Sequence, residues 1–355
     1  MQKNISNNIT KKQNLITPKE LKKKLPITEN IKKQILFSRQ TICNIINKKD
    51  SRILVICGPC SIHNTKEALE YAKLLKKISL KLNKTIYIVM RVYFEKPRTI
   101  IGWKGLINDP YMNNSYDINT GLYIARKLLL ELSELEIPLA TEILDPNTPQ
   151  YLSELFSWSA IGARTTESQI HRELASSLNM PLGFKNNTDG SITTAINSIQ
   201  SASISHNFIS INQEGLVCSI KTLGNKNCHI ILRGGKKTNY HTKDIKDCSK
   251  NLIKAGLPSN IMIDCSHSNS NKNFERQITV IDSIISQIKK GNTSIIGIML
   301  ESYINEGNQL MNINNYNKLK YGISITDGCI SWETTEKILH KIYNKINKIL
   351  PLRFL

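Results

Sequence analysis

Two cysteines, Cys57 and Cys60, are the first residues of the chain whose types and spacing suggest chemistry. They lie in the string Cys57-Gly58-Pro59-Cys60 at the end of a short apolar run, and His63 follows closely. A Cys-x-x-Cys pair of this kind could act as a dithiol redox couple. Alternatively, one sulfur carries the chemistry and the other belongs to the hydrophobic core. The rest of the chain decides between these two interpretations.

The apolar run Ile53–Cys57 argues against a redox pair. Both sulfurs of such a pair must be accessible at one place, whereas Cys57 lies inside the predicted strand and Cys60 lies beyond its end. A thioredoxin-like protein would also be much shorter than 355 residues, and no tryptophan precedes Cys57. We therefore interpret Cys57 as a core residue and Cys60 as the reactive one.

Six cationic residues stand at or just beyond the ends of other strand-like apolar runs. Positive charge gathered at one place calls for polyanionic ligands, and arginine forks suit the oxygens of phosphates and carboxylates. Phosphorylated small substrates fit this pattern. The six residues are Arg91, Lys96, Arg98, Arg164, Lys185 and Arg233.

A second group of residues near the predicted strand ends could bind a metal ion. It combines a thiol, an imidazole and two carboxylates, a mixed set that favours a divalent transition metal over a closed zinc site or an all-oxygen magnesium site. Each residue alone could equally be structural, but their shared position favours a site. The four residues are Cys60, His267, Glu301 and Asp327.

The chain from residue 53 onward provides a scaffold that would bring these strand ends together. Its apolar runs alternate with helical patterns or long loops, as expected for parallel strands covered on both faces. Eight such units favour an α/β fold of the (β/α)8 TIM-barrel type, whose active sites lie at the carboxyl ends of the strands. A dinucleotide-binding sheet is less consistent, because Gly-x-Gly-x-x-Gly does not follow the first strand. The predicted strands are Ile53–Cys57, Ile86–Met90, Leu139–Ile143, Ala160–Ala163, Leu182–Lys185, His229–Leu232, Ile261–Cys265 and Ile295–Leu300.

Two segments fall outside the barrel pattern. Residues 1–50 form a predicted N-terminal helical extension with an oligomeric or regulatory role, and residues 51–355 form the catalytic barrel. Two short runs near 208–221, joined by the polar residues 212–215, predict a β-hairpin inserted into the barrel.

The net charge of +20 raises the alternative of a nucleic-acid-binding protein. However, the lysines form short clusters such as Lys289-Lys290, aromatic residues make up only 6% of the chain, and we find no zinc-finger or RNA-binding signature. We therefore attribute the charge to a lysine-rich surface and predict no nucleic-acid partner. Eight scattered cysteines, no apolar run of about 18 residues and no secretory signal predict a cytoplasmic protein with no membrane partner.

Several strings in the chain closely resemble class I 3-deoxy-D-arabino-heptulosonate-7-phosphate (DAHP) synthases. The resemblance covers nearly the whole chain, including the N-terminal extension and the hairpin. The strings are Gly58–His63, Tyr93–Thr99, Gly102–Gly105, Ile161–Gln169, Gly183–Asn186, Leu232–Lys236, Ser266-His267, Glu306–Gln309 and Tyr321–Asp327.

The resemblance implies a metal-dependent condensation of phosphoenolpyruvate with D-erythrose 4-phosphate and water, the first step of the shikimate pathway. It implies one divalent transition metal (Mn, Fe, Co, Zn or similar) bound by the four residues given above. Lys96, Cys60 and His267 would be catalytic, with Lys96 a proton donor and Glu142 a candidate water-activating base. The implied substrate-binding residues are Arg91, Lys96, Arg98, Thr99, Glu142, Ala163, Arg164, Lys185 and Arg233.

The strings around 144–151 and 264–267 look most like the tyrosine-sensitive isoenzyme. The resemblance therefore implies a homo-oligomer, dimer or tetramer, that is inhibited by tyrosine. A sibling enzyme that condenses phosphoenolpyruvate with another phosphorylated sugar is the nearest alternative, although Lys96-Pro97-Arg98-Thr99 favours the short aldose. The implied effector residues are Gln150, Leu174, Leu178, Phe208 and Ser210.

Overall fold

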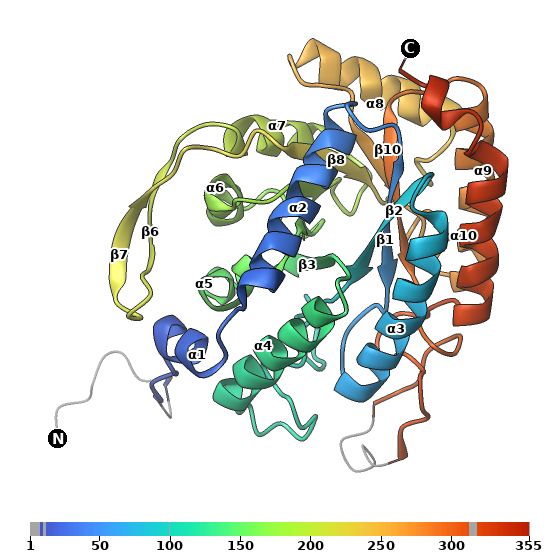
Figure 1. The fold of residues 1–355 in the computed structure, drawn as a ribbon. Coiled ribbons are helices and arrows are strands. Elements are labelled where there is room, and N and C mark those ends of the chain that lie inside the picture. The colour runs from blue at the N-terminus through green and yellow to red at the C-terminus, as the bar shows by residue number, and fades with distance from the viewer. Residues whose placement is uncertain (1–7, 10–11, 99, 312–317, 355) are drawn as a thin grey trace, which may run out of the picture.

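The computed structural model describes residues 8–9, 12–98, 100–311 and 318–354, and its core is a closed barrel of eight parallel strands (Figure 1). Around the barrel the strands follow the order β1-β10-β9-β8-β5-β4-β3-β2, so the predicted TIM-barrel fold is confirmed. The barrel strands are β1 (Ile53–Gly58), β2 (Ile86–Arg91), β3 (Leu139–Ile143), β4 (Trp158–Ile161), β5 (Leu182–Lys185), β8 (Cys228–Leu232), β9 (Ile261–Asp264) and β10 (Ile295–Glu301).

Alternate residues of each strand point into the barrel or outward to the helices. In β1, Leu54 and Ile56 belong to the inner apolar cluster, whereas Val55 and Cys57 belong to the larger cluster between strands and helices. Both faces are therefore buried, which explains why the strands are continuous apolar runs in the sequence.

Helices surround the barrel and connect its strands (Figure 1). Half of them begin at a polar residue whose side chain accepts from the first turn; Asn64, for example, caps the helix that follows β1. The helices are α1 (Pro18–Lys24), α2 (Glu29–Ile46), α3 (Thr65–Leu82), α4 (Ile118–Glu134), α5 (Thr148–Leu152), α6 (Gln169–Ser177), α7 (Thr193–Ala202), α8 (Thr242–Lys254), α9 (Gln277–Lys289) and α10 (Trp332–Ile346).

Helix α2 closes the amino end of the barrel. Ile42 and Ile45 pack into the same apolar cluster as the inward-facing residues of the strands. The guanidinium of Arg39 donates to the carbonyl of Phe156 at 2.8 Å, two residues before β4 begins. The amino end is thus sealed, and a functional site must lie at the other end. The division into an extension of residues 1–50 and a barrel of residues 51–355 stays a prediction.

The predicted hairpin is present as the antiparallel pair β6 (Asn207–Ile211) and β7 (Val217–Lys221), which forms its own two-stranded sheet. Its tip reaches α1 and α5: the amide of Lys19 donates to the carbonyl of Gln213 at 2.9 Å, and the side chain of Gln213 donates to Gln150 at 3.0 Å. The hairpin therefore links the N-terminal segment to the barrel.

Helix and strand ends differ from the predictions by a few residues. Strand β4 begins at Trp158 rather than Ala160, because Trp158 fills the barrel interior and pairs with Ala140 of β3. Between β3 and β4 the chain forms the short α5 followed by a 3-10 turn, Ser153–Leu155. Within the described residues, the helices are too short or too polar to span a membrane.

Burial of His229 on β8 should make the protein less stable in mild acid. Burial lowers the pKa of this imidazole to about 3, against about 6.5 in an unfolded chain. The unfolded state therefore binds the proton first, so the stabilisation is present above pH 6.5 and declines as the pH falls toward 3. Between pH 7 and 5 the free energy of unfolding should fall by about 2 kcal/mol from this group.

Urea unfolding of the wild type and of His229→Leu at both pH values measures this contribution. The variant should lose about 2 kcal/mol less than the wild type over the interval. Equal losses in the two proteins would contradict the assignment to His229.

Candidate active site

A cavity of about 860 Å³ opens at the carboxyl end of the barrel. The six cations predicted to converge all line it, although they come from the ends of four different strands and the connections that follow them. A cavity of this size holds small organic substrates, and its lining strongly favours anionic ones. The six lining cations are Arg91, Lys96, Arg98, Arg164, Lys185 and Arg233.

Arg91, the last residue of β2, is 1% exposed and joins two strand ends. Its guanidinium donates to the carboxylate of Glu301 at 2.8 Å, to the carbonyl of Pro59 at 3.1 Å and to the carbonyl of Cys60 at 3.3 Å. It also lies 3.9 Å over the ring of Tyr93. Burial opposes the charged form of Arg91, but the surrounding electron-rich groups keep its pKa above the ordinary value.

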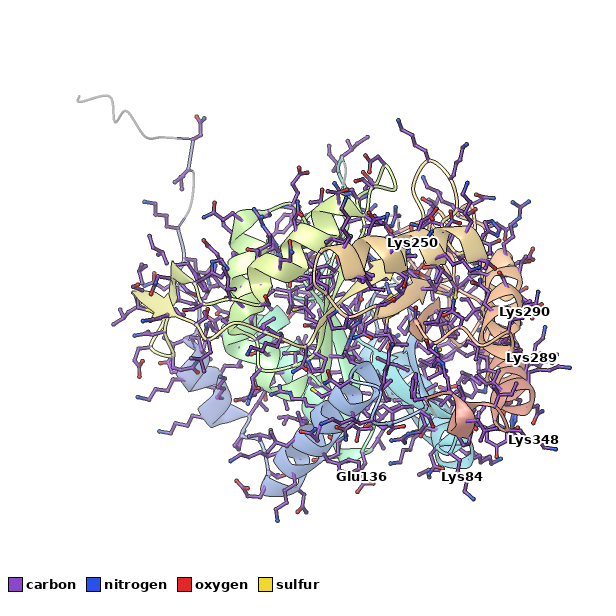
Figure 2. All side chains as sticks on the ribbon, turned by 90° about the horizontal axis from the view of Figure 1, so that it is seen from above. Lys84, Glu136, Lys250, Lys289, Lys290 and Lys348 are labelled. Carbon is purple, nitrogen blue, oxygen red and sulfur yellow. The ribbon has the colours of Figure 1, made fainter. Side chains whose placement is uncertain are left out.

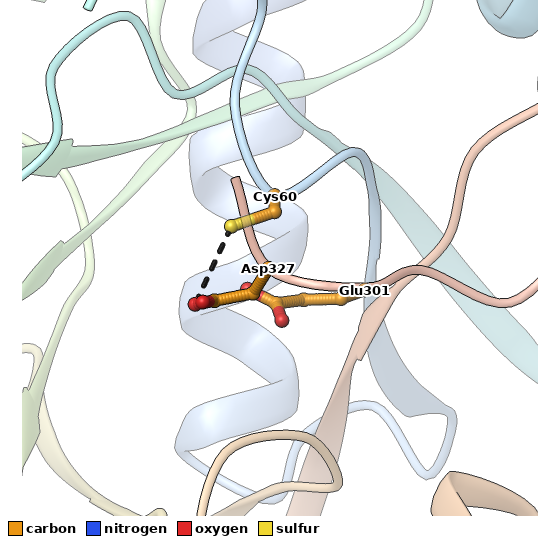
Figure 3. A group of neighbouring side chains, drawn as sticks. All are labelled: Cys60, Glu301 and Asp327. Atoms are coloured by element: carbon orange, nitrogen blue, oxygen red, sulfur yellow. Dashed lines mark hydrogen bonds between the residues drawn. The ribbon is translucent and has the colours of Figure 1, made fainter. Parts of the chain in front are cut away.

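Cys60, Glu301 and Asp327 form a compact group at this end of the barrel (Figure 3). Their ligand atoms all lie within 4.8 Å of one another, and the sulfur of Cys60 is 3.7 Å from Oδ2 of Asp327. The set of one sulfur and two carboxylate oxygens is suitable for a metal ion. These three residues, predicted from sequence as ligands, therefore lie where they could hold one together.

His267, the fourth predicted ligand, borders this group from the loop after β9. Its Nε2 atom is 3.8 Å from Oε1 of Glu301, and its backbone adopts a left-handed conformation with a φ of 56°. Its Nδ1 atom lies 2.9 Å from Oδ2 of Asp264. A proton held on Nδ1 by that carboxylate would leave the lone pair of Nε2 available to a metal ion beside Glu301.

Asp264 is a residue that the sequence reasoning missed. It is fully buried at the end of β9, and its Oδ2 atom lies 3.1 Å from the ammonium of Lys185 as well as beside His267. Burial would raise its pKa, but His267 and Lys185 hold it well below the usual range. A signal was available: a carboxylate that interrupts a buried parallel strand must have partners.

Lys96 connects the cationic part of the cavity to the Cys60, Glu301 and Asp327 group. Its ammonium donates to the sulfur of Cys60 at 3.1 Å and to the carbonyl of Cys60 at 3.3 Å. Burial alone would lower its pKa, but Cys60 and Glu301 raise it above the ordinary lysine value. Lys96 is therefore protonated at neutral pH and can donate a proton into the cavity.

The thiol of Cys60 has a pKa raised to about 11 by burial and by the nearby Glu301 carboxylate, despite Lys96. A thiol that coordinates a metal loses its proton, so binding of a cation here would release one. Cys57 differs from Cys60 in its surroundings. It is fully buried, and its sulfur lies 3.1 Å from the hydroxyl of Tyr71, outside the cavity lining.

The remaining predicted substrate residues also line the cavity where the structure describes them. The carboxylate of Glu142 lies against the backbone of Gly162, where an added Cβ would be 2.5 Å from it. Ala163, the residue after Gly162, lines the same cavity. Gly102 similarly leaves room for the guanidinium of Arg98. Thr99 lies outside the described residues.

The five predicted effector residues lie on α5, α6, the turn after α6, and β6, away from the cavity lining. Leu174 and Leu178 are buried in the main core, whereas Phe208 and Ser210 are half-buried on the hairpin. Gln150 on α5 accepts from Gln213 at the hairpin tip. This contact joins two of the segments that carry these residues, α5 and the hairpin.

Many lysines lie on the outer surface of the helices and their ends. Figure 2 shows Lys250, Lys289, Lys290 and Lys348 projecting outward from different elements, and all four are exposed. Spreading over several elements is the arrangement expected of a generally basic surface, whereas a nucleic-acid interface concentrates its cations on one face.

Comparisons with known proteins agree with this site. A sequence model described as the DAHP synthetase I family matches residues 20–340. The chain is 55% identical over 355 residues to the Tyr-sensitive phospho-2-dehydro-3-deoxyheptonate aldolase of Escherichia coli, covering 99% of each chain. It is 51% identical to the Phe-sensitive enzyme of the same organism, covering 94% of each.

A solved structure of a phospho-2-dehydro-3-deoxyheptonate aldolase from Francisella tularensis is similar over 98% of this chain and 99% of its own. Its TM-score is 0.93 and its sequence identity is 46%. Similarity at this level covers the barrel, the N-terminal helices and the hairpin together. The chain therefore belongs to the DAHP synthetase I family and is a DAHP synthase, an enzyme of the first step of the shikimate pathway.

Proposed function

We propose that the cationic wall of the cavity binds both phosphorylated substrates. The single observation that carries this assignment is the convergence of six cations on one cavity beside the Cys60 group. Two phosphates and one carboxylate would match so many positive charges. Phosphoenolpyruvate would contact Arg91, Lys96, Arg164, Lys185 and Arg233, with Glu142 and Ala163 beside it, and erythrose 4-phosphate would contact Arg98 and Thr99.

The proposed metal ligands are Cys60, His267, Glu301 and Asp327. The donor set fits a divalent transition metal, because it combines a soft sulfur with nitrogen and carboxylate oxygens. When bound, such an ion supplies Lewis-acid polarisation of an aldehyde oxygen. The buried Asp264, whose Oδ2 atom lies 2.9 Å from the other ring nitrogen, would orient His267 for this role.

The reaction joins the methylene carbon of phosphoenolpyruvate to the aldehyde carbon of erythrose 4-phosphate. The arginines and Lys185 would hold the phosphoenolpyruvate so that this carbon faces the aldehyde. Lys96, protonated in the cavity, would donate a proton to the aldehyde oxygen as it gains charge. The neighbouring carbon, which carries the phosphate, becomes electron-poor; water adds there with Glu142 as the proposed base, and phosphate then leaves from the same carbon.

Removal of metal provides the test of this proposal. We expect phosphate release from phosphoenolpyruvate to require erythrose 4-phosphate, to stop after treatment with a chelator, and to return when Mn²⁺ or another divalent ion is added. Loss of the chelated enzyme's fold must be excluded by circular dichroism. Full activity in an enzyme shown by elemental analysis to be metal-free would contradict the proposed metal site.

We further propose that the enzyme is a homo-oligomer, dimer or tetramer, that is inhibited by tyrosine and works in the cytoplasm. The similarity to a relative named Tyr-sensitive supports this, although relatives named Phe-sensitive and Trp-sensitive are 51% and 48% identical. The exposed apolar residues Ile209 and Val217 on the hairpin suit an interface with a second copy.

Saturating tyrosine should reduce the initial rate strongly, while phenylalanine and tryptophan at the same concentration should leave it nearly unchanged.

Phe208→Ala should weaken inhibition by tyrosine several-fold without changing the uninhibited rate, because Phe208 lies on the hairpin away from the cavity lining. The measurement is the phosphate-release rate at several effector concentrations. A rate insensitive to all three amino acids would refute feedback inhibition.

A further inference from the structure

Three asparagine side chains tie together the loops that follow β5, β8 and β9. They are Asn186, Asn239 and Asn269, and we refer to them as the asparagine bridge. Asn186 and Asn269 are 0% and 2% exposed, respectively. Buried amides of this kind need every donor and acceptor satisfied, so their contacts fix the loops in one arrangement.

Asn186 uses both ends of its side chain. Its amide nitrogen donates to the carbonyls of Gly234 at 2.9 Å and Asn187 at 2.8 Å. Its carbonyl oxygen accepts from the backbone amide of Arg233 at 2.8 Å and from the side chain of Asn239 at 3.1 Å. Asn186, the residue after Lys185, therefore holds both the amide of Arg233 and the carbonyl of Gly234.

Asn239 and Asn269 extend the bridge to β9. The side chain of Asn239 accepts from the amide of Gly234 at 2.7 Å, and its backbone amide donates to the side chain of Asn269 at 2.9 Å. Asn269 in turn donates to the carbonyls of Leu232 at 3.1 Å and Asp264 at 2.9 Å. Each loop is therefore hydrogen-bonded to the next by an amide side chain.

Two glycines let the three backbones approach closely enough for these contacts. Gly234 has a φ of 75°, and a Cβ added there would lie 2.7 Å from the amide of Asn269. A Cβ added to Gly235 would lie 2.2 Å from the amide of Gly190, in the loop after β5. Only glycine fits at either position, so the loops pack backbone against backbone.

The residues on these loops include the predicted anion ligands Lys185 and Arg233 and the predicted metal ligand His267. We propose that the asparagine bridge is a positioning device that sets the spacing of Lys185 and Arg233 for the anionic groups of phosphoenolpyruvate. This inference rests on the proposed function, because it takes those two cations as ligands of that substrate.

The chemistry of the bridge makes Asn186→Asp an informative substitution. It keeps the shape but replaces the amide nitrogen, so an oxygen would face the carbonyls of Gly234 and Asn187. Asn186→Ala removes the contacts without adding charge. We expect both variants to raise the KM for phosphoenolpyruvate about tenfold or more, as loss of groups that orient ligands typically does, with kcat and the KM for erythrose 4-phosphate changed far less.

Asn225 provides a matched control. It is also a buried asparagine that donates to two backbone carbonyls, those of Leu178 and Met180, and accepts from the amide of Asn227, but it lies outside the cavity lining. Asn225→Asp should lower thermal stability to a similar extent while leaving the KM for phosphoenolpyruvate unchanged. An equal rise of KM in this variant would assign the effect to general loss of stability and overturn the inference.

A double-mutant cycle with Arg233→Ala distinguishes failure of the bridge from failure of the proposed substrate site. If the bridge acts through Arg233, the Arg233→Ala/Asn186→Ala enzyme should have a KM for phosphoenolpyruvate close to that of Arg233→Ala alone. An unchanged KM in Arg233→Ala would refute the proposed role of Arg233. A raised KM in Arg233→Ala but not in either Asn186 variant would refute the bridge alone.

Asn239→Ala keeps the test available if the Asn186 variants do not fold. Asn239 is only partly buried, and its loss removes the contacts to Gly234 and Asn186 while the core stays intact. The same selective rise in the KM for phosphoenolpyruvate is expected. A wild-type KM in a folded Asn239→Ala enzyme would overturn the proposal.

Discussion

Replacing Cys60 by alanine should abolish DAHP synthesis, with kcat reduced at least about 10³-fold, because the metal proposed at this site would contribute several kcal/mol by polarising the aldehyde. Cys60 supplies the sulfur of the Cys60, Glu301 and Asp327 group, and it also accepts from Lys96, the proposed proton donor. Both its proposed roles would be lost together. Phosphate release and the metal content of the purified enzyme are the two measurements.

Cys57 offers the matched control, since it stands three residues away in the same string. Its sulfur contacts the hydroxyl of Tyr71 in a fully buried position, and a serine there could keep that hydrogen bond. Cys57→Ser should therefore retain metal and most activity. Equal loss of activity in Cys57→Ser and Cys60→Ala would instead support a dithiol mechanism, and wild-type metal affinity in Cys60→Ala would remove the sulfur from the ligand set.

The fold and the charged end of the barrel could be predicted from local patterns. Each barrel strand is a short apolar run, and the side chains that follow it must emerge at the same end because the strands are parallel. Arg91 and Lys185 are the last residues of β2 and β5, so counting along the sequence suffices to place them.

The partners of these side chains could not be predicted in this way. Gln277 at the start of α9 donates to the carbonyl of Glu301 and accepts from its amide, both at 2.9 Å, although 24 residues separate the two. Nothing in the apolar periodicity of α9 distinguishes such a buried amide from a surface one. The roles of Asp264 and of the asparagine bridge could not be predicted for the same reason, because hydrogen bonds between distant loops produce no periodic pattern in the sequence.

The position of Asp327 depends on a long irregular connection between β10 and α10. Isolated bridges such as Gly307 with Cys329 fix part of this connection, and the hydroxyl of Ser61 lies 2.8 Å from that of Thr326. Such contacts place Asp327 beside Cys60 but follow no helical or strand pattern. The place of Asp327 in the loop after the last strand made it a candidate ligand, but the apolar pattern alone could not place it beside Cys60.

The buried pair of Arg91 and Glu301 should produce the second large effect. The pair is separated by 2.8 Å and is at most 2% exposed on either side. Removal of one partner of such a pair leaves an uncompensated buried charge, so Arg91→Met should lower the free energy of unfolding by about 3–5 kcal/mol. Arg91→Lys should also lose at least about 10²-fold in kcat/KM, because one ammonium cannot replace the planar fork toward Glu301, Pro59 and Cys60.

Arg126 is a control of the same kind outside the cavity. It is fully buried and donates to Glu154 at 2.6 Å and to the carbonyl of Tyr151 at 2.9 Å, so Arg126→Met should lower the free energy of unfolding yet retain the KM for phosphoenolpyruvate. The pair itself is tested by urea unfolding of metal-free Arg91→Met, Glu301→Gln and the double variant. Because the second substitution removes the charge that the first left unpaired, the double variant should be more stable than the sum of the single losses predicts, by about 0.5–3 kcal/mol. Strict additivity would mean that Arg91 and Glu301 contribute independently, and the interpretation of Arg91 as the link between the substrate cations and the metal ligands would be wrong.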